Sequence, residues 1–334
     1  MDLETTLEEA DDSPTKDTSP RFIVRNAEFA LSPQPPIEWV IDQLIAEGSI
    51  SIFYGEPGSK KTYSLLSLAV CVALGRPWLG YESNPRKVLI IDEESGERRL
   101  TIRIGAAIRG EFGREDTPIE FVSLAGFKLD KKTDAEELYK LIQDRDAGLT
   151  IIDALADVMD GDENSKQDTQ PVFSNLRKIA EGTNSAIIVI HHSNKSGGYR
   201  GSSAIKGALD LMVKIESEND SNWVYFRSEK TRDTEGITLV GVATWTENQF
   251  YLSPADGSEK MQIKPKSQQF VIDYLSNNGD SAVSDITDNA DICSPESARR
   301  AIYTLAAEKI IRRVNAGGQG KEAIYALTNK ETNN

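Results

Sequence analysis

The chain has 334 residues, which is room for one large core and a small second module. Its formal net charge of −15 argues against a surface that attracts nucleic acid everywhere. Two cysteines give no disulfide framework, and no apolar stretch is long enough to span a bilayer. We therefore expect a cytoplasmic protein that does not bind membranes.

Residues 1–20 hold seven acidic residues and one lysine among Ser, Thr and Pro. This composition predicts a disordered acidic tail, because too few apolar side chains are present to form a packed core. A solvated leader is the default interpretation, and contact with a basic partner is the alternative.

Residues 49–62 read SISIFYGEPGSKKT, which is a β-branched and aromatic run followed by a Gly-rich turn. An apolar helix is expected to follow over 61–74. This layout is typical of a P-loop, in which backbone N–H groups at a helix N-terminus bind the phosphates of a nucleotide. Lys61 is expected to reach the β- and γ-phosphates of ATP, and Thr62 to hold Mg²⁺. The predicted nucleotide contacts are Gly55, Glu56, Pro57, Gly58, Ser59, Lys60, Lys61, Thr62 and Tyr63.

Lys60 departs from the usual P-loop pattern, because it stands where the second glycine is expected. If that position requires a positive φ, a lysine there costs on the order of 1 kcal/mol or more. It would also add a second ammonium beside the phosphates. The alternative for the whole segment is an ordinary strand–helix turn with chance glycines.

Two further predicted strands, over 88–92 and 149–153, end in carboxylates. Asp153 is expected to hold Mg²⁺ together with Thr62. Glu94 is favoured over Glu93 as the general base that polarises the attacking water. The alternative is that Glu94 caps a helix that starts near Ser95, where an acid suits the helix dipole.

The only two histidines, His191 and His192, end a predicted buried strand over 186–191. Neighbours on a strand point to opposite faces, so the pair is poorly placed to chelate one metal. A γ-phosphate sensor is the favoured role, and a polar strand end with local hydrogen bonds is the alternative. Lys230 and Arg232 follow a predicted strand over 223–228, and both face the same side if the chain there is extended.

The predicted fold class is α/β, with helices alternating between parallel strands and an antiparallel extension after Asp210. We expect a core over 21–252, a polar linker over 253–267 and a separate module over 268–330. Three short helices followed by two strands give this module the pattern of a winged helix. Arg299 and Arg300 lie on its expected recognition helix, and DNA binding and protein docking are equally favoured roles for it.

Residues 35–252 resemble the RecA-type ATPase core of hexameric helicases of the plasmid RepA class and, more distantly, DnaB-type replicative helicases. The segments that carry the resemblance are PPIEWVIDQLIAEGSISIFYGEPGSKKT, VLIIDEES, LTIIDALADVMDGDENS, IIVIHHSNKSGGYRGSSAIKGALD and SEKTRD.

The resemblance implies Glu94 as the catalytic base, Asp153 as the Mg²⁺ acid and one histidine as the sensor. It implies that residues 193–203 form a mobile loop that contacts single-stranded DNA in the channel of a hexameric ring. Phosphate contacts are expected from Lys195 and Arg200 in this loop, and Lys206, just after it, is a further expected DNA contact. Lys230 and Arg232 would reach the ATP of a neighbouring protomer. The alternative, both for this pair and for the loop over 193–203, is that the charges are simply solvated at the surface.

The function expected on this basis is a ring-forming DNA helicase driven by ATP and Mg²⁺, with replication proteins as further partners. The alternative is an ATP-gated DNA-binding or loading protein without unwinding activity.

Overall fold

The computed structural model describes residues 23–194, 198–217, 221–255, 266–307, 309–315 and 322–328. The predicted tail, Lys195 and most of the predicted linker therefore lie outside the described residues.

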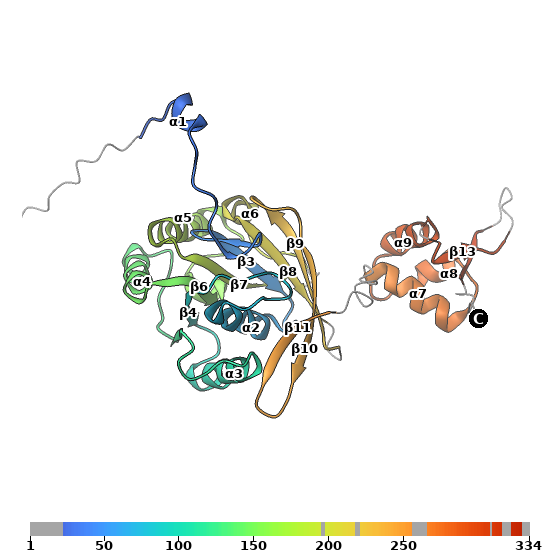
Figure 1. Cartoon of the computed structure of the whole chain (residues 1–334). Coiled ribbons are helices and arrows are strands. Elements are labelled where there is room, and N and C mark those ends of the chain that lie inside the picture. Colours follow the sequence, from blue (N-terminus) through green and yellow to red (C-terminus); the bar gives the residue numbers. More distant parts are fainter. Residues whose placement is uncertain are drawn as a thin grey trace, which may run out of the picture.

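One nine-stranded sheet forms the centre of the core, in the order β11-β10-β9-β8-β3-β7-β6-β4-β5 (Figure 1). Neighbouring strands from β5 across to β8 run parallel, whereas β9, β10 and β11 continue the sheet in antiparallel pairs. This arrangement confirms the predicted mostly parallel α/β sheet and its antiparallel extension. The strands are β3 (Ile50–Gly55), β4 (Lys87–Asp92), β5 (Ile119–Ser123), β6 (Ala147–Asp153), β7 (Ala186–His192), β8 (Leu211–Glu216), β9 (Trp223–Thr231), β10 (Thr238–Trp245) and β11 (Phe250–Pro254).

Helices cover both faces of the sheet, as the alternation of strands and helices predicts (Figure 1). Along β3, Phe53 packs into the core beneath α2 and α3, and its neighbours Ile52 and Tyr54 pack into the core beneath α4 and α5. The period of two is that of a strand buried on both faces. The helices of this part are α2 (Lys61–Leu74), α3 (Glu97–Gly110), α4 (Lys132–Arg145), α5 (Lys166–Thr183), α6 (Ser203–Ala208) and a 3₁₀ turn, η1 (Leu155–Val158).

The segment that leads into the core contains short elements that the sequence did not predict. A hairpin of β1 (Trp39–Ile41) and β2 (Ile45–Ala46) buries Val40 and Ile41. The one-turn helix α1 (Ala27–Leu31) precedes it and buries none of its residues. Elements of two to five residues carry too few periods of a hydrophobic pattern to be recognised.

The C-terminal residues form a unit with its own apolar core around Ile286, Ile302 and Leu305. Its three helices were predicted, and its three-stranded antiparallel sheet has the order β12-β14-β13. The elements are α7 (Lys266–Asn278), β12 (Ser281–Ala282), α8 (Val283–Asp288), α9 (Pro295–Ala307), β13 (Ile311–Arg313) and β14 (Ile324–Leu327). The winged-helix assignment and the domain boundaries stay predictions.

None of the helices in the described ranges has the length and apolarity needed to cross a membrane.

Close packing at the end of α3 generates a stability prediction. A Cβ atom added to Gly110 would lie 1.8 Å from the backbone oxygen of Phe250 in β11. We expect Gly110→Ala to lower the free energy of unfolding by about 1–3 kcal/mol, the usual cost of overpacking, as measured by urea denaturation. Gly207→Ala is the matched control, because a Cβ at that exposed helical position meets nothing within 4 Å. Equal losses in both variants would contradict the close approach.

Candidate active site

The Gly-rich turn between β3 and α2 folds around the side chain of Lys61. Its Nζ donates to the backbone oxygens of Gly55 at 2.9 Å and Glu56 at 2.8 Å, and the residue is only 6% exposed. Gly55 is required here, because a Cβ would lie 2.2 Å from the backbone oxygen of Ile215. Burial lowers the pKa of Lys61, and the carboxylates of Asp153, Glu94 and Glu56 oppose that shift. The result is a cation at a helix N-terminus, as a polyphosphate site requires.

Lys60 has φ 65° and ψ 21°, so the glycine position of the pattern does adopt the left-handed conformation. Its ammonium has two hydrogen-bond acceptors. Nζ donates to Ser217 Oγ at 2.5 Å and to the Ser221 backbone oxygen at 2.9 Å. These two acceptors, which lie between β8 and β9, hold the side chain in place, and a contact of Lys60 with the phosphates stays a prediction.

Thr62 and Asp153 meet as predicted. Thr62 Oγ1 donates to Asp153 Oδ2 at 2.8 Å, and Asp153 Oδ1 is buried without a hydrogen-bond partner among the described residues. Burial raises the pKa of Asp153 to about 7, the Thr62 hydrogen bond opposes this, and the carboxylates of Glu94 and Asp92 add to it. A hydroxyl beside an unsatisfied carboxylate is a set of hard oxygen ligands. The pair therefore fits Mg²⁺, whose charge would stabilise the ionised carboxylate.

The two glutamates after β4 have different surroundings. Glu93 accepts hydrogen bonds from the backbone N–H groups of Ala125 at 2.8 Å and Gly126 at 2.9 Å, so its carboxylate holds the segment after β5. Glu94 is about half exposed, and its Oε2 lies 3.8 Å from His192 Nε2. Its charge also acts on both Lys61 and Asp153. The geometry thus favours Glu94 as the base, and the helix begins only at Glu97 with Gly96 as its cap.

Two further acids complete this edge of the sheet. Asp92 is fully buried, and its Oδ1 accepts from the backbone N–H groups of Glu94 and Ser95 at 2.9 and 2.5 Å. It therefore holds the turn that presents Glu94. The sequence interpretation missed Asp157, whose pKa is raised by burial and then by Glu94. Its position four residues after Asp153 in the acidic segment ADVMD was the available signal.

The two adjacent histidines lie on opposite faces of β7 and have different surroundings. His192 is level with Gly55 in the β3–β7 register and lies next to Glu94, at the candidate site. His191 is completely buried, and its Nε2 donates to the Arg200 backbone oxygen at 2.7 Å. Its ring packs edge-on against Tyr199 at 5.5 Å. The structure therefore favours His192 as the sensor and gives His191 a supporting position.

The loop after β7 is bound to the P-loop strand. The backbone N–H of Ser193 donates to the Gly55 backbone oxygen at 3.1 Å, and Tyr199 packs edge-on against Tyr54 at 5.4 Å. The Arg200 guanidinium forms an ion pair with the buried Glu163 while about half of the side chain stays exposed. Lys206 is exposed on α6. DNA contact by either residue stays a prediction.

Lys230 and Arg232 lie at the opposite edge of the sheet. β9 runs to Thr231, so Lys230 lies within the strand and not after it, which corrects the predicted strand end. Lys230 Nζ donates to three backbone oxygens at or just after the end of α6, at 2.5–3.3 Å. Arg232 pairs at 2.9 Å with Asp210, whose other oxygen accepts from the backbone N–H of Ile50.

Ile50 begins β3 and Gly55 ends it, so this pair lies about 17 Å from the P-loop along the strand, at 3.3 Å per residue. Neither cation therefore lies at the P-loop of its own chain in this arrangement. Arg299 and Arg300 lie exposed on α9 of the C-terminal unit.

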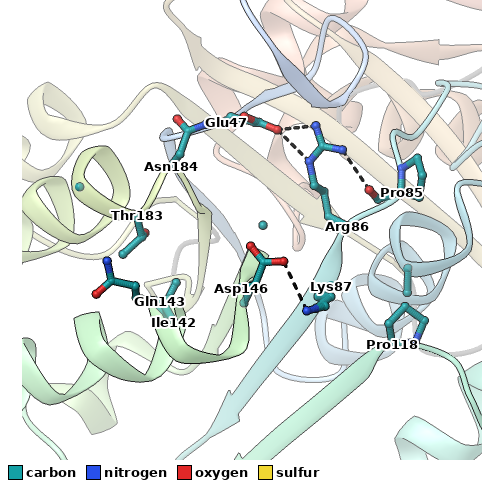
Figure 2. Close-up of a pocket in the computed structure, with 14 residues that line it drawn as sticks. Glu47, Pro85, Arg86, Lys87, Pro118, Ile142, Gln143, Asp146, Thr183 and Asn184 are labelled. Carbon is teal, nitrogen blue, oxygen red and sulfur yellow. Dashed lines mark hydrogen bonds and ion pairs between the residues drawn. The ribbon is translucent and has the colours of Figure 1, made fainter.

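A pocket of about 660 Å³ also lies at the edge opposite the P-loop. Figure 2 shows the residues that line it. Its walls include the first residues of β4 and β6 and the last residues of α4 and α5. Arg86 Nε donates to Glu47 Oε1 at 2.8 Å, and Lys87 pairs with Asp146 at 3.3 Å. Because Asp92 and Asp153 end the strands that begin here, this pocket is separate from the candidate active site.

The chain matches the model of a known protein family. A family model described as an AAA domain covers residues 16–198, more than half of the chain. The matched range contains the P-loop, Glu94, Asp153 and both histidines, and it ends before β8. No curated protein matches the chain.

The contrast between the two glutamates can be tested directly. We expect Glu94→Gln to keep ATP binding and to lower turnover by roughly 10²-fold or more, the scale of a lost general base. Glu93→Gln is the matched control, and it should keep most turnover while lowering thermal stability, because it weakens two hydrogen bonds to a carboxylate. Steady-state hydrolysis and equilibrium binding measure the two effects. A larger loss of turnover in Glu93→Gln would reverse the assignment.

Burial lowers the pKa of His191 to about 4, below its ordinary value of 6.5. Between pH 4 and 6.5, His191 therefore binds a proton in the unfolded chain but not in the native chain. The free energy of unfolding consequently decreases as the pH falls from about 6.5 to 4. At 1.36 kcal/mol per unit the loss reaches about 3 kcal/mol. Urea denaturation of His191→Asn across this range should show a shallower slope than the wild-type protein. An unchanged slope would show that another group causes the pH dependence.

Proposed function

The chain belongs to the AAA domain family of P-loop ATPases, and we propose that it is a ring-forming DNA motor of the RepA helicase class. It would hydrolyse ATP to move single-stranded DNA in the replication of a plasmid, phage or other mobile element. One observation carries the proposal: the ends of four adjacent parallel strands bring Lys61, Asp153, Glu94 and His192 to one edge of the sheet.

The residues at this edge divide the chemistry of phosphoryl transfer. Lys61 and the backbone N–H groups of the turn bind the β- and γ-phosphates of ATP. Thr62 and Asp153 would hold Mg²⁺, which would supply positive charge to neutralise the phosphates. Glu94 orients and deprotonates the attacking water. His192, 3.8 Å from Glu94 Oε2, responds to the presence of the γ-phosphate.

The loop after β7 is well placed to connect hydrolysis with DNA. Ser193 is bonded to the P-loop through the Gly55 backbone oxygen, and Tyr199 packs on Tyr54 of the same strand. A change at the γ-phosphate therefore reaches the loop through only a few contacts. Arg200 and Lys206 supply cations for the DNA backbone. Arg200 would exchange its pairing with Glu163 for a phosphate.

The edge distant from the P-loop supports an assembly of several protomers. Arg232 is about half exposed, and it cannot reach its own nucleotide site across the sheet. In a ring, Lys230 and Arg232 would face the ATP of the neighbouring protomer, where an arginine stabilises the charge of the transition state. The C-terminal unit, with Arg299 and Arg300 exposed, would act as a winged helix that recruits DNA or a replication protein.

A second candidate function is an ATP-gated DNA-binding or loading protein that does not unwind DNA. The left-handed Lys60 favours it, because its ammonium ties the P-loop to the turn between β8 and β9. Such a link can slow the P-loop rearrangement that turnover requires. A strand-displacement assay on forked DNA, beside a size measurement with and without ATP, separates the two functions.

The ring motor predicts complementation between inactive variants. Lys61→Ala should abolish hydrolysis, and Arg232→Ala should keep nucleotide binding while hydrolysis falls by about 10³-fold, the scale of a lost arginine finger. Mixed rings contain some interfaces with an intact P-loop and an intact Arg232. We therefore expect the mixture to regain DNA-stimulated ATPase activity that neither variant shows alone.

Arg177→Ala is the matched control, because Arg177 pairs with the same Asp210 at 2.8 Å. It should keep hydrolysis if Arg232 acts on a neighbouring protomer. An equal loss in Arg177→Ala would assign Arg232 to support of Asp210. A mixture that stays inactive although its subunits exchange would contradict catalysis shared between protomers.

A further inference from the structure

Three aromatic side chains gather beside the P-loop, and neither the family match nor the proposed mechanism uses them as a group. Tyr63 follows the P-loop threonine directly, Trp245 ends β10, and Phe250 begins β11. The Tyr63 ring lies 5.8 Å from Trp245 and 4.9 Å from Phe250, and the latter two rings are 4.9 Å apart. We call these three residues the aromatic platform.

Strand directions place the aromatic platform at the phosphate edge of the sheet. β8 runs parallel to β3, β9 runs opposite to β8, and β10 runs opposite to β9. β10 therefore points the same way as β3, and its last residue, Trp245, lies at the edge where Gly55 begins the P-loop. A ligand held by its phosphates in the P-loop has its remaining parts at this edge.

One ring of the aromatic platform is anchored in the core, and another is open to solvent. Phe250 is fully buried, whereas Trp245 is 41% exposed. The turn that joins them is held by Arg109, whose Nε donates to the Asn248 backbone oxygen at 2.8 Å. Because β11 also packs closely on Gly110, the indole is presented by a rigid support. Little side-chain entropy then remains to be lost when a ligand stacks on it.

Cations border the platform on the P-loop side. The Lys60 ammonium lies 6.0 Å from the centre of the Trp245 ring, and the Arg103 guanidinium lies 5.8 Å from the centre of the Tyr63 ring. A large π surface next to a polyphosphate site has the chemistry that a nucleotide requires, since bases stack on aromatic side chains. If Trp245 served only to pack the core, its indole would be buried, as the ring of Phe250 is.

We propose that the aromatic platform binds the base of the nucleotide whose phosphates occupy the P-loop, with Trp245 as the stacking surface. The proposal rests on the proposed ATPase function and adds the residue that recognises the nucleoside. Stacking accepts any base, so the platform separates nucleotides from phosphates without a base and does not select one base strictly.

The test compares ATP with inorganic tripolyphosphate, which has the phosphates and no base. Binding of each to the full-length protein is measured by calorimetry, and tryptophan fluorescence is followed during both titrations. Trp245→Ala should weaken ATP binding about tenfold to a hundredfold, in keeping with the loss of one stacked base, and should leave tripolyphosphate binding unchanged. Trp245→Phe should restore most of the ATP affinity. Quenching by ATP should disappear in both variants and persist in Trp39→Phe, the matched control on β1.

The outcomes separate this inference from the function on which it rests. If the wild-type protein binds neither ATP nor tripolyphosphate, the ATPase function is wrong and the inference falls with it. In a second outcome, the wild-type protein binds both ligands while Trp245→Ala binds ATP as tightly as the wild type does. That result overturns the proposed base site and leaves the ATPase function standing. Equal weakening of ATP and tripolyphosphate would also overturn the base site, because it would show that the substitution distorts the P-loop as a whole. Loss of affinity for a single-stranded oligonucleotide, with ATP binding intact, would assign the platform to DNA.

Discussion

The parallel direction of neighbouring strands is the constraint on which the site depends. Because β3, β4, β6 and β7 all end at the same edge, residues more than ninety positions apart become neighbours. The Thr62–Asp153 hydrogen bond and the approach of His192 to Glu94 both follow from this direction. An antiparallel partner in the centre of the sheet would send one of these groups to the other edge.

The same constraint separates two sets of charges. Carboxylates gather around Lys61 at one edge, and Lys230, Arg232 and Arg177 gather around Asp210 at the other. Asp153 is buried and lies close to other acids, so its ionised form is strongly stabilised when a cation binds beside it. In this way the fold brings a buried carboxylate and a lysine together at one edge of the sheet before any ligand arrives.

Much of the fold and part of the site could be predicted from the sequence. Helix α2 has the predicted bounds, and the central strands lie within two residues of theirs, since long apolar runs between turn residues carry a strong signal. Sequence could not decide between Glu93 and Glu94, because the answer depends on two backbone N–H groups more than thirty residues away. For the same reason, the sequence did not predict that the ammonium of Lys60 donates hydrogen bonds to Ser217 and Ser221, between β8 and β9. Trp245 escaped attention because only the order of strands brings it to the P-loop.

The hydrogen bond from Ser193 to the Gly55 backbone oxygen has a consequence for genetics. It joins two main-chain groups, so exchange of either side chain leaves both atoms of the bond in place. A scan of single alanine substitutions would therefore pass over the most direct link between the P-loop and the loop after β7. The link would become visible only by chemical synthesis that replaces the peptide N–H with an ester oxygen, or through a proline at residue 193.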